Sequence, residues 1–334
     1  HRDLHSFPTR RSSDLQYDGT QRHMAQPAGV EPLLDEAYTS LHGLQLGQAE
    51  AALERALATD FDDEEVLYAM KCARWWADAM DREKAYPNAF EAGEFIMARW
   101  KAFLSFASRQ GFQSVRTLSA FKQFAFGVAF ERYGSLATDG DSPDPELVLR
   151  LGKTSKGRGN YEAAMRHLEN ALALRRDDPA ILAELADTCA LVDDTQRSKV
   201  LFREAFFINP QAIDLDLLEA DFIAKLADKA VEYGKSGVEL VEWIPIYAET
   251  LKVFSVRREL KPVEAGKLKQ SMYEMERELD SDGSRRTILI PRLINKYMWL
   301  VDYYRDHKED KSKIDELLLK IKLLDPVVYK QYVA

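Results

Sequence analysis

Glycine and proline are scarce in this sequence. The 16 Gly and 12 Pro among 334 residues make up about 8% of the chain, whereas average usage is about 12%. Architectures made of many short strands need frequent turn residues, so this scarcity disfavours an all-β sandwich or barrel and favours a helix-rich protein. The hydrophobic fraction of 46% is too high for a disordered chain, because it supplies enough apolar surface for a large core.

Basic residues and long apolar runs are also lacking. The chain has 46 Lys and Arg against 55 Asp and Glu, which gives a formal net charge of −9. A protein that binds the phosphate backbone needs a basic surface, so we expect no nucleic-acid partner. The best apolar stretch, residues 124–130, is far shorter than the roughly 20 residues of a membrane span. We therefore expect no transmembrane segment.

Cysteines and catalytic signatures are equally sparse. Cys72 and Cys189 cannot build a disulfide framework, and both lie within helical patterns, where a buried, reduced thiol is expected. The histidines are widely separated, without the spacing of a zinc protease, and no Gly-x-Ser-x-Gly elbow occurs. Residues 152–154 match only the end of a phosphate-binding loop, because Leu147 stands where that motif requires glycine. The sequence therefore predicts neither enzymatic activity nor a cofactor.

Acidic residues gather in two loops. One loop holds Asp139, Asp141 and Asp144, and the other spans residues 60–65. A calcium loop needs alternating oxygen ligands with glycine at its sixth position, and Asp144 stands there instead. Both clusters precede expected helices, so we expect them to cap helix N-termini and to interact with the helix dipole. No metal site is predicted.

The first 15 residues, HRDLHSFPTRRSSDL, fit nothing that follows. They resemble the translation of a common sequencing adapter at all fifteen positions, and such segments are excluded from reasoning about the fold. We expect residues 16–31 to form a flexible N-terminal segment, with Met24 as the candidate start and a cytoplasmic location. A signal or lipoprotein leader lost at the junction would instead place the protein in the periplasm or envelope.

A period of 34 residues lies between Asp144 and Pro210. At this spacing small and large apolar residues recur in register, as in the pairs Leu151 with Leu185, Gly152 with Ala186, Ala164 with Ser198, Leu168 with Phe202, and Ala171 with Ala205. Small residues at such positions let two helices approach closely, and large ones fill the gap between them. The pattern that begins at Leu151 resembles the tetratricopeptide repeat, a unit of two antiparallel helices. The second copy departs at its turn, where Asp193 and Asp194 replace the usual glycine.

The resemblance implies an all-α protein, a right-handed α-solenoid of about six helical hairpins over residues 32–334. The clearest repeats are 146–178 and 179–212. Long, divergent, aromatic-rich hairpins are expected at 61–138, and degenerate repeats at 213–334. The helices expected outside the clear repeats are a pair within 32–59 and single helices near 63–80, 87–109, 113–136, 214–233, 239–255, 262–279, 285–306 and 311–324.

Partner-binding residues follow from the resemblance, because in this family the first helix of each repeat lines a concave groove. The candidates at the corresponding offsets are Glu146, Leu149, Arg150, Lys153 and Lys156 in the first clear repeat, and Glu184, Asp187 and Leu191 in the second. The basic side chains of the first repeat, Arg150, Lys153 and Lys156, thus lie beside the acidic side chains of the second, Glu184 and Asp187. The alternative to a partner site is that these charges pair between helices or form a solvated face. The asparagine with which some of these proteins clamp a terminal carboxylate is absent.

Aromatic residues concentrate between residues 75 and 130. Trp75, Trp76 and Trp100 are the largest of them, and adjacent helical residues such as Trp75 and Trp76 point about 100° apart. One interpretation is a core with wide gaps between long helices. The other is an apolar groove for a partner helix or peptide.

The leading functional hypothesis is a non-enzymatic scaffold that binds a protein or peptide in the groove of the solenoid. The alternative is a periplasmic or envelope component of a transport or assembly complex that carries a small apolar ligand, and the aromatic-rich region motivates it. A third class is an enzyme whose site is assembled only by tertiary contacts. The sequence identifies neither the partner nor the oligomeric state.

Overall fold

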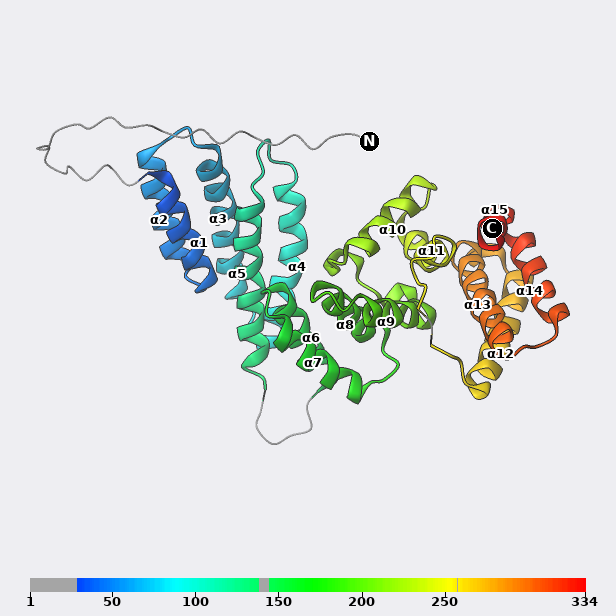
Figure 1. Ribbon diagram of the computed structural model, residues 1–334. Helices are drawn as coiled ribbons and strands as arrows, with labels where there is room; N and C mark the ends of the chain where they lie inside the picture. The colour runs from blue at the N-terminus through cyan, green and yellow to red at the C-terminus, as the bar shows by residue number, and fades with distance from the viewer. Residues whose placement is uncertain (1–28, 138–143, 257) are drawn as a thin grey trace, which may run out of the picture.

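The computed structural model describes residues 29–137, 144–256 and 258–334, and within these ranges the protein consists of helices and connecting turns without a strand (Figure 1). Residues 1–15, which resemble an adapter, lie outside the described ranges, as do Asp139 and Asp141. The expected flexible segment 16–31 also lies outside them except for its end, where the first helix begins. No helix in the described ranges is long and apolar enough to cross a membrane.

The N-terminal part is a bundle of five helices, coloured from blue to teal in Figure 1. They are α1 (Val30–His42), α2 (Leu46–Thr59), α3 (Glu64–Glu83), α4 (Ala89–Ala107) and α5 (Val115–Gly134). Helix α5 packs against α4 and also returns to α1 and α3. The long helices expected at 61–138 are therefore present, but the last of them, α5, packs against α1 of the first helix pair.

The two clear repeats occupy the middle of the molecule. Their helices are α6 (Pro145–Gly157), α7 (Tyr161–Leu174), α8 (Pro179–Leu191) and α9 (Thr195–Ile208). Helix α8 begins and ends 34 residues after α6, and α9 does the same with respect to α7. The 34-residue period is therefore confirmed as a repeat of two packed helices.

Local chemistry explains why both repeats form the same hairpin. Asp144 and Asp178 cap α6 and α8, and each is followed by a proline in the first helical turn. At the turn within each repeat, Gly159 has φ of 77° and its counterpart Asp193 has φ of 63°. Aspartate tolerates this left-handed conformation better than most side chains do, so it replaces the usual glycine.

The close approach expected at the small residue Gly152 is also present. A Cβ atom at this position would lie 2.6 Å from Cγ of Leu168, the large residue that fills the gap in the facing helix. Both residues are buried, as are the equivalent Ala186 and Phe202 in the next repeat. The register of small and large residues thus specifies how the two helices of each repeat meet.

The C-terminal part contains six further α-helices within the described ranges. They are α10 (Asp221–Glu232), α11 (Gly237–Thr250), α12 (Pro262–Ser281), α13 (Arg286–Asp306), α14 (Lys311–Leu324) and α15 (Pro326–Val333), with short 3₁₀ turns η1 (Pro210–Ala212), η2 (Leu215–Leu217) and η3 (Gly283–Arg285). Helix α15 was not expected from the sequence. Helix α11 packs against α9, α10, α13 and α15, and so ties this part to the repeats.

The helix expected at 214–233 is wrong in its first turns. Residues 213–220, which we call the crossing segment, contain only the 3₁₀ turn η2, and α10 begins at Asp221. The segment contacts α4, α5, α6 and α8, and three of its backbone groups form hydrogen bonds with side chains of α6 and α8. Two core clusters meet at this segment, one formed by α1–α5 together with Leu151 of α6 and one formed by α8–α15.

Candidate functional site

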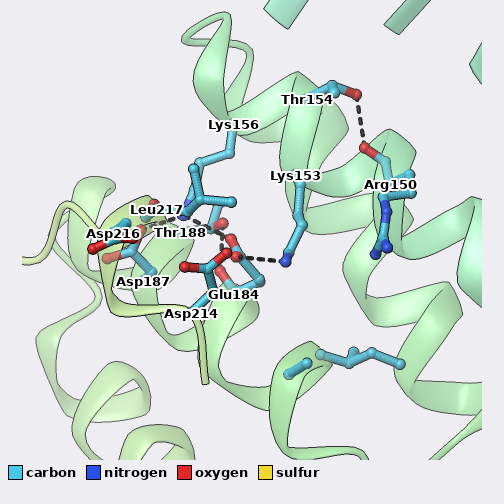
Figure 2. A network of polar contacts seen from close by, with 12 residues as sticks. Arg150, Lys153, Thr154, Lys156, Glu184, Asp187, Thr188, Asp214, Asp216 and Leu217 are labelled. Atoms are coloured by element: carbon cyan, nitrogen blue, oxygen red, sulfur yellow. Dashed lines mark hydrogen bonds and ion pairs between the residues drawn. The ribbon is translucent and has the colours of Figure 1, made fainter. Parts of the chain in front are cut away.

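The first helices of the two clear repeats face each other through a buried ion network. Lys156 of α6 lies between two carboxylates of α8, with its Nζ 2.7 Å from Oε2 of Glu184 and 2.5 Å from Oδ2 of Asp187. Lys153, one turn earlier on α6, lies 3.3 Å from Oε1 of Glu184. Figure 2 shows both lysines pointing from α6 toward the acidic side chains of α8. Two cations and two anions therefore balance one another.

Burial makes this network energetically demanding. Lys156 and Glu184 are each 2% exposed and Asp187 is 0% exposed. Burial alone would lower the pKa of Lys156, but the attraction of Glu184 and Asp187 outweighs it and raises that pKa above its usual value. Burial would likewise raise the pKa of Glu184, and the two lysines lower it instead. The ion pairs therefore favour the charged forms of Lys156 and Glu184, whereas burial raises the pKa of Asp187.

The crossing segment closes over this network through its backbone. Lys156 donates a hydrogen bond from Nζ to the carbonyl oxygen of Leu217, at 2.9 Å. Asp187 accepts two hydrogen bonds at Oδ1, from the backbone N–H groups of Glu219 at 2.8 Å and of Ala220 at 2.7 Å. Side chains of the repeats thus satisfy backbone groups that would otherwise be buried without partners.

Two more lysines hold the acidic side chains of the crossing segment. Lys101 of α4 lies 2.7 Å from Oδ1 of Asp214 and 3.3 Å from Oδ2 of Asp216. Lys122 of α5 lies 2.5 Å from Oε2 of Glu219. We call Lys101, Lys122, Lys156 and Asp187, which contact the crossing segment, the inner face; they belong to four different helices.

Leucines of the crossing segment complete the contact. Leu217 is half-buried and packs against the N-terminal cluster, whereas Leu215 and Leu218 pack against the C-terminal cluster. The segment therefore presents acidic groups to the lysines and leucines to both cores. This combination of backbone hydrogen bonds, charge pairs and anchored apolar side chains is the chemistry with which folded proteins recognise extended peptides.

The predicted groove residues need correction in the light of their burial. Leu149, Lys156, Glu184 and Asp187 are buried, so their side chains present no open surface to a partner. The charged residues among them, Lys156, Glu184 and Asp187, form ion pairs between helices, which was the alternative to a partner site. Leu191, at the end of α8, is only half-buried.

The remaining groove candidates are also engaged within the chain. Arg150 turns toward α4, where its Nε lies 2.6 Å from Oε1 of Glu94, and it also pairs with Glu146 at 2.7 Å. Glu146 makes a further ion pair with Arg175 at 3.2 Å. Together with Lys153, these side chains keep partial exposure. They form the rim beside the buried network.

The aromatic residues of the N-terminal bundle form core rather than groove. Trp76 and Trp100 are buried, and each ring lies 5.5 Å from that of Phe103, measured between ring centroids. Trp75 is half-buried, with the Arg99 guanidinium 4.2 Å from its ring centroid. The interpretation of Trp76 and Trp100 as an open apolar groove is therefore wrong, and the core interpretation describes them.

Two comparisons with known proteins identify no relative of this chain. No protein-family model matches this chain, and no curated protein matches it.

Other reactive groups offer little chemistry. Burial raises the pKa of Cys72 to about 12 and that of Cys189 to about 11, so neither thiol is an active nucleophile near neutral pH. Within the described ranges, no group of three or more His, Cys, Asp or Glu side chains is arranged to hold a metal ion. Both thiols are buried, as the sequence predicted.

Lys101, Lys122, Asp214, Asp216 and Glu219 were missed by the sequence analysis. The three acidic residues were assigned to the first turns of a helix, and the two lysines lie in hairpins that depart from the repeat pattern. Each pair joins residues about a hundred positions apart in the chain. No local pattern marks a contact at that separation.

Proposed function

We propose that this protein is a non-enzymatic α-solenoid scaffold, related to the tetratricopeptide-repeat proteins, that binds an extended segment of a partner protein on the inner face. The proposed segment carries acidic residues around a leucine, as the crossing segment does. The 34-residue offset of α6 and α8, and the packing of successive helices in pairs, support a solenoid. The cytoplasmic location that we expect is compatible with this role.

The crossing segment is the observation that carries the proposal. It is a short stretch without α-helix, and the inner face holds both its backbone and its side chains. Lys156 and Asp187 form hydrogen bonds with the backbone of the crossing segment, and these bonds do not depend on which side chains the segment carries. Lys101 and Lys122 provide preference for acidic residues, and the contact of Leu217 with the N-terminal core provides an apolar anchor.

A partner peptide would compete with the crossing segment for the inner face. Because the segment belongs to the same chain, its effective concentration is on the order of millimolar, as for a short tether. The unmodified protein should therefore bind such a peptide weakly, and a protein with a loosened crossing segment should bind it about tenfold more tightly or better. A partner peptide then binds only when the crossing segment is released from the inner face.

Fluorescence anisotropy with a labelled peptide of residues 211–221 tests the proposal. The loosened protein carries Leu217→Ser and Glu219→Gln in the full chain, and circular dichroism must show that its helix content is unchanged. A peptide with serine in place of its leucine at 217 is the matched control, and so is the loosened protein with Lys122→Met added. Saturable binding that both controls weaken supports the proposal. Absence of saturable binding to the folded, loosened protein refutes it.

A second candidate function, the carriage of a small ligand, draws on the cavities of the C-terminal part. Three cavities there have volumes of about 220, 360 and 330 Å³. The aromatic-rich bundle that first motivated this alternative does not support it, because Trp76 and Trp100 are buried in the core. A ligand site is therefore to be sought between α9, α12 and α13.

A further inference from the structure

Lys296 of α13 is a half-buried cation without a counter-ion. Its ammonium lies 4.9 Å from the ring centroid of Phe207 on α9, and no ion pair or hydrogen bond within the described ranges includes it. Burial, together with repulsion by the nearby Arg292, lowers its pKa to about 8. A cation in such surroundings is costly unless an anion accompanies it.

Three carboxylates near Lys296 form ion pairs with arginines. Glu242, whose side chain is fully buried, accepts hydrogen bonds from Nε and from the terminal nitrogen of Arg292, at 2.9 and 2.7 Å. Arg258 pairs with Glu204 at 2.8 Å and with Glu264 at 2.9 Å, and these three residues line one cavity together with Lys296. Each of these carboxylates therefore has an arginine partner, and none of them forms an ion pair with Lys296.

The preceding residue, Asn295, supplies a second unpartnered group. It is 4% exposed, its Oδ1 has no hydrogen-bond partner, and no hydrogen bond within the described ranges includes its side chain. An amide can turn to present either its oxygen or its nitrogen. A buried amide without a partner costs free energy, so Asn295 is available to bond a ligand.

Two adjoining cavities bring these groups together. The smaller, of about 30 Å³, is lined by both Asn295 and Lys296. The larger, of about 330 Å³, shares Lys296, Phe207 and Ile208 with it, and its wall continues with Leu260 and Leu268. The larger volume lies at the lower end of the range of roughly 300 to 1,000 Å³ that is typical of small-molecule sites.

We propose that the two cavities bind a small organic carboxylate, with the Lys296 ammonium as its counter-ion and the Asn295 amide as a hydrogen-bond donor. The head group lies in the smaller cavity, and an apolar body lies against Phe207, Leu260 and Leu268 in the larger one. Such a ligand provides both the ion pair that Lys296 lacks and a hydrogen-bond partner for the Asn295 amide. The site uses none of the residues of the inner face, so it is independent of the proposed peptide binding.

Calorimetric titration of the full chain tests the site with hexanoate and benzoate as probes, and with hexanamide and benzamide as neutral controls of the same shape. We expect saturable binding of a carboxylate, and binding at least about tenfold weaker to Lys296→Met, since a charge-assisted contact is lost. Lys267→Met, which removes a lysine from the wall of the larger cavity, should change the affinity much less. Equal affinity of the unmodified protein and Lys296→Met, or no saturable binding of either carboxylate, overturns the proposal.

A second measurement needs no variant protein. In protein with ¹³C-labelled lysine, the ε-carbon signal of Lys296 should titrate near pH 8 without ligand. Saturation with the carboxylate that binds should move this midpoint toward the usual lysine value, because the bound anion favours the charged amine. A midpoint that does not move under saturating carboxylate rules out contact with Lys296. Peptide binding to the inner face should be the same with and without the carboxylate.

Discussion

Oδ1 of Asp187 lies 2.7 Å from the backbone nitrogen of Ala220, and this hydrogen bond joins a repeat helix to the end of the crossing segment. The same oxygen accepts from the backbone of Glu219, and the other oxygen pairs with Lys156. One fully buried carboxylate therefore satisfies two backbone donors and one cation. Its loss would remove the acceptor of both N–H groups and one of the two carboxylates that pair with Lys156.

Asp187→Ala should destabilise the protein strongly. Removal of one partner from a buried, hydrogen-bonded ion pair costs about 3 to 5 kcal/mol, and the orphaned N–H groups of Glu219 and Ala220 add to this. Urea denaturation followed by circular dichroism measures the change in the free energy of unfolding. Asp216→Ala is the control, since the Asp216 side chain is 72% exposed, and should change stability by about 0.5 kcal/mol or less. Similar denaturation midpoints for the two variants would contradict the role assigned to Asp187.

Glu94→Gln should reduce the sensitivity of the protein to acid. Glu94 accepts hydrogen bonds from Arg150 at 2.6 Å and from the Tyr133 hydroxyl at 2.6 Å. Burial raises its pKa, but these hydrogen bonds and the Arg150 charge outweigh burial and lower the pKa below its usual value. The stabilisation is therefore present above the unfolded pKa of about 4.3, and it is lost as the pH falls through the folded pKa.

Melting temperatures between pH 7 and pH 3 measure this effect. The difference between the unmodified protein and Glu94→Gln should shrink as the pH falls below about 4.3. Glu91→Gln, an exposed change on the same helix, reports the general effect of removing one negative charge. A difference for Glu94→Gln that stays constant over the whole range, or that follows Glu91→Gln, would show that the contacts with Arg150 and Tyr133 do not favour the charged carboxylate.

Gly157→Ala and Gly266→Ala should have effects of opposite sign. A Cβ at Gly157 would lie 2.0 Å from Cδ1 of Phe126, whose ring is buried, so we expect a loss of about 1 to 3 kcal/mol from overpacking. Gly266 is exposed within α12 with no atom within 4 Å of a Cβ, so alanine should stabilise the helix by about 0.5 to 1 kcal/mol. Equal effects in chemical denaturation would mean that the contact of α6 with α5 is not tight.

Trp76→Ala should lower stability by about 3 to 5 kcal/mol, the usual loss when a large aromatic residue leaves a core. Its ring lies 5.5 Å from Phe103 and 5.9 Å from Phe124, between ring centroids. Trp75→Ala should cost less because Trp75 is only half-buried. Thermal denaturation of the two variants measures the difference. A larger loss of stability for Trp75→Ala than for Trp76→Ala would contradict the assignment of Trp76 to the core.

Local sequence patterns were sufficient for the helices and their turns. The 34-residue period predicted two helix pairs at the same offset, because residues of matching size recur where helices touch. The acidic clusters predicted caps correctly where the structure describes them, as at Asp63 and Asp144. At Asp193 the departure from glycine proved compatible with the left-handed turn. The start of α10 was predicted too early, because its expected first turns lie in the crossing segment.

The sequence by itself determined an all-helical chain, two matched repeats and the placement of charged residues on the facing helices of those repeats. These properties arise from residues within a few turns of one another, where propensity, capping and periodicity decide the outcome. Only the tertiary structure decided that Lys156, Glu184 and Asp187 are buried and that the crossing segment covers them. That outcome depends on residues such as Lys101 and Asp214, which meet because the intervening helices fold back. No pattern of neighbouring residues in the sequence indicates that these two side chains pair.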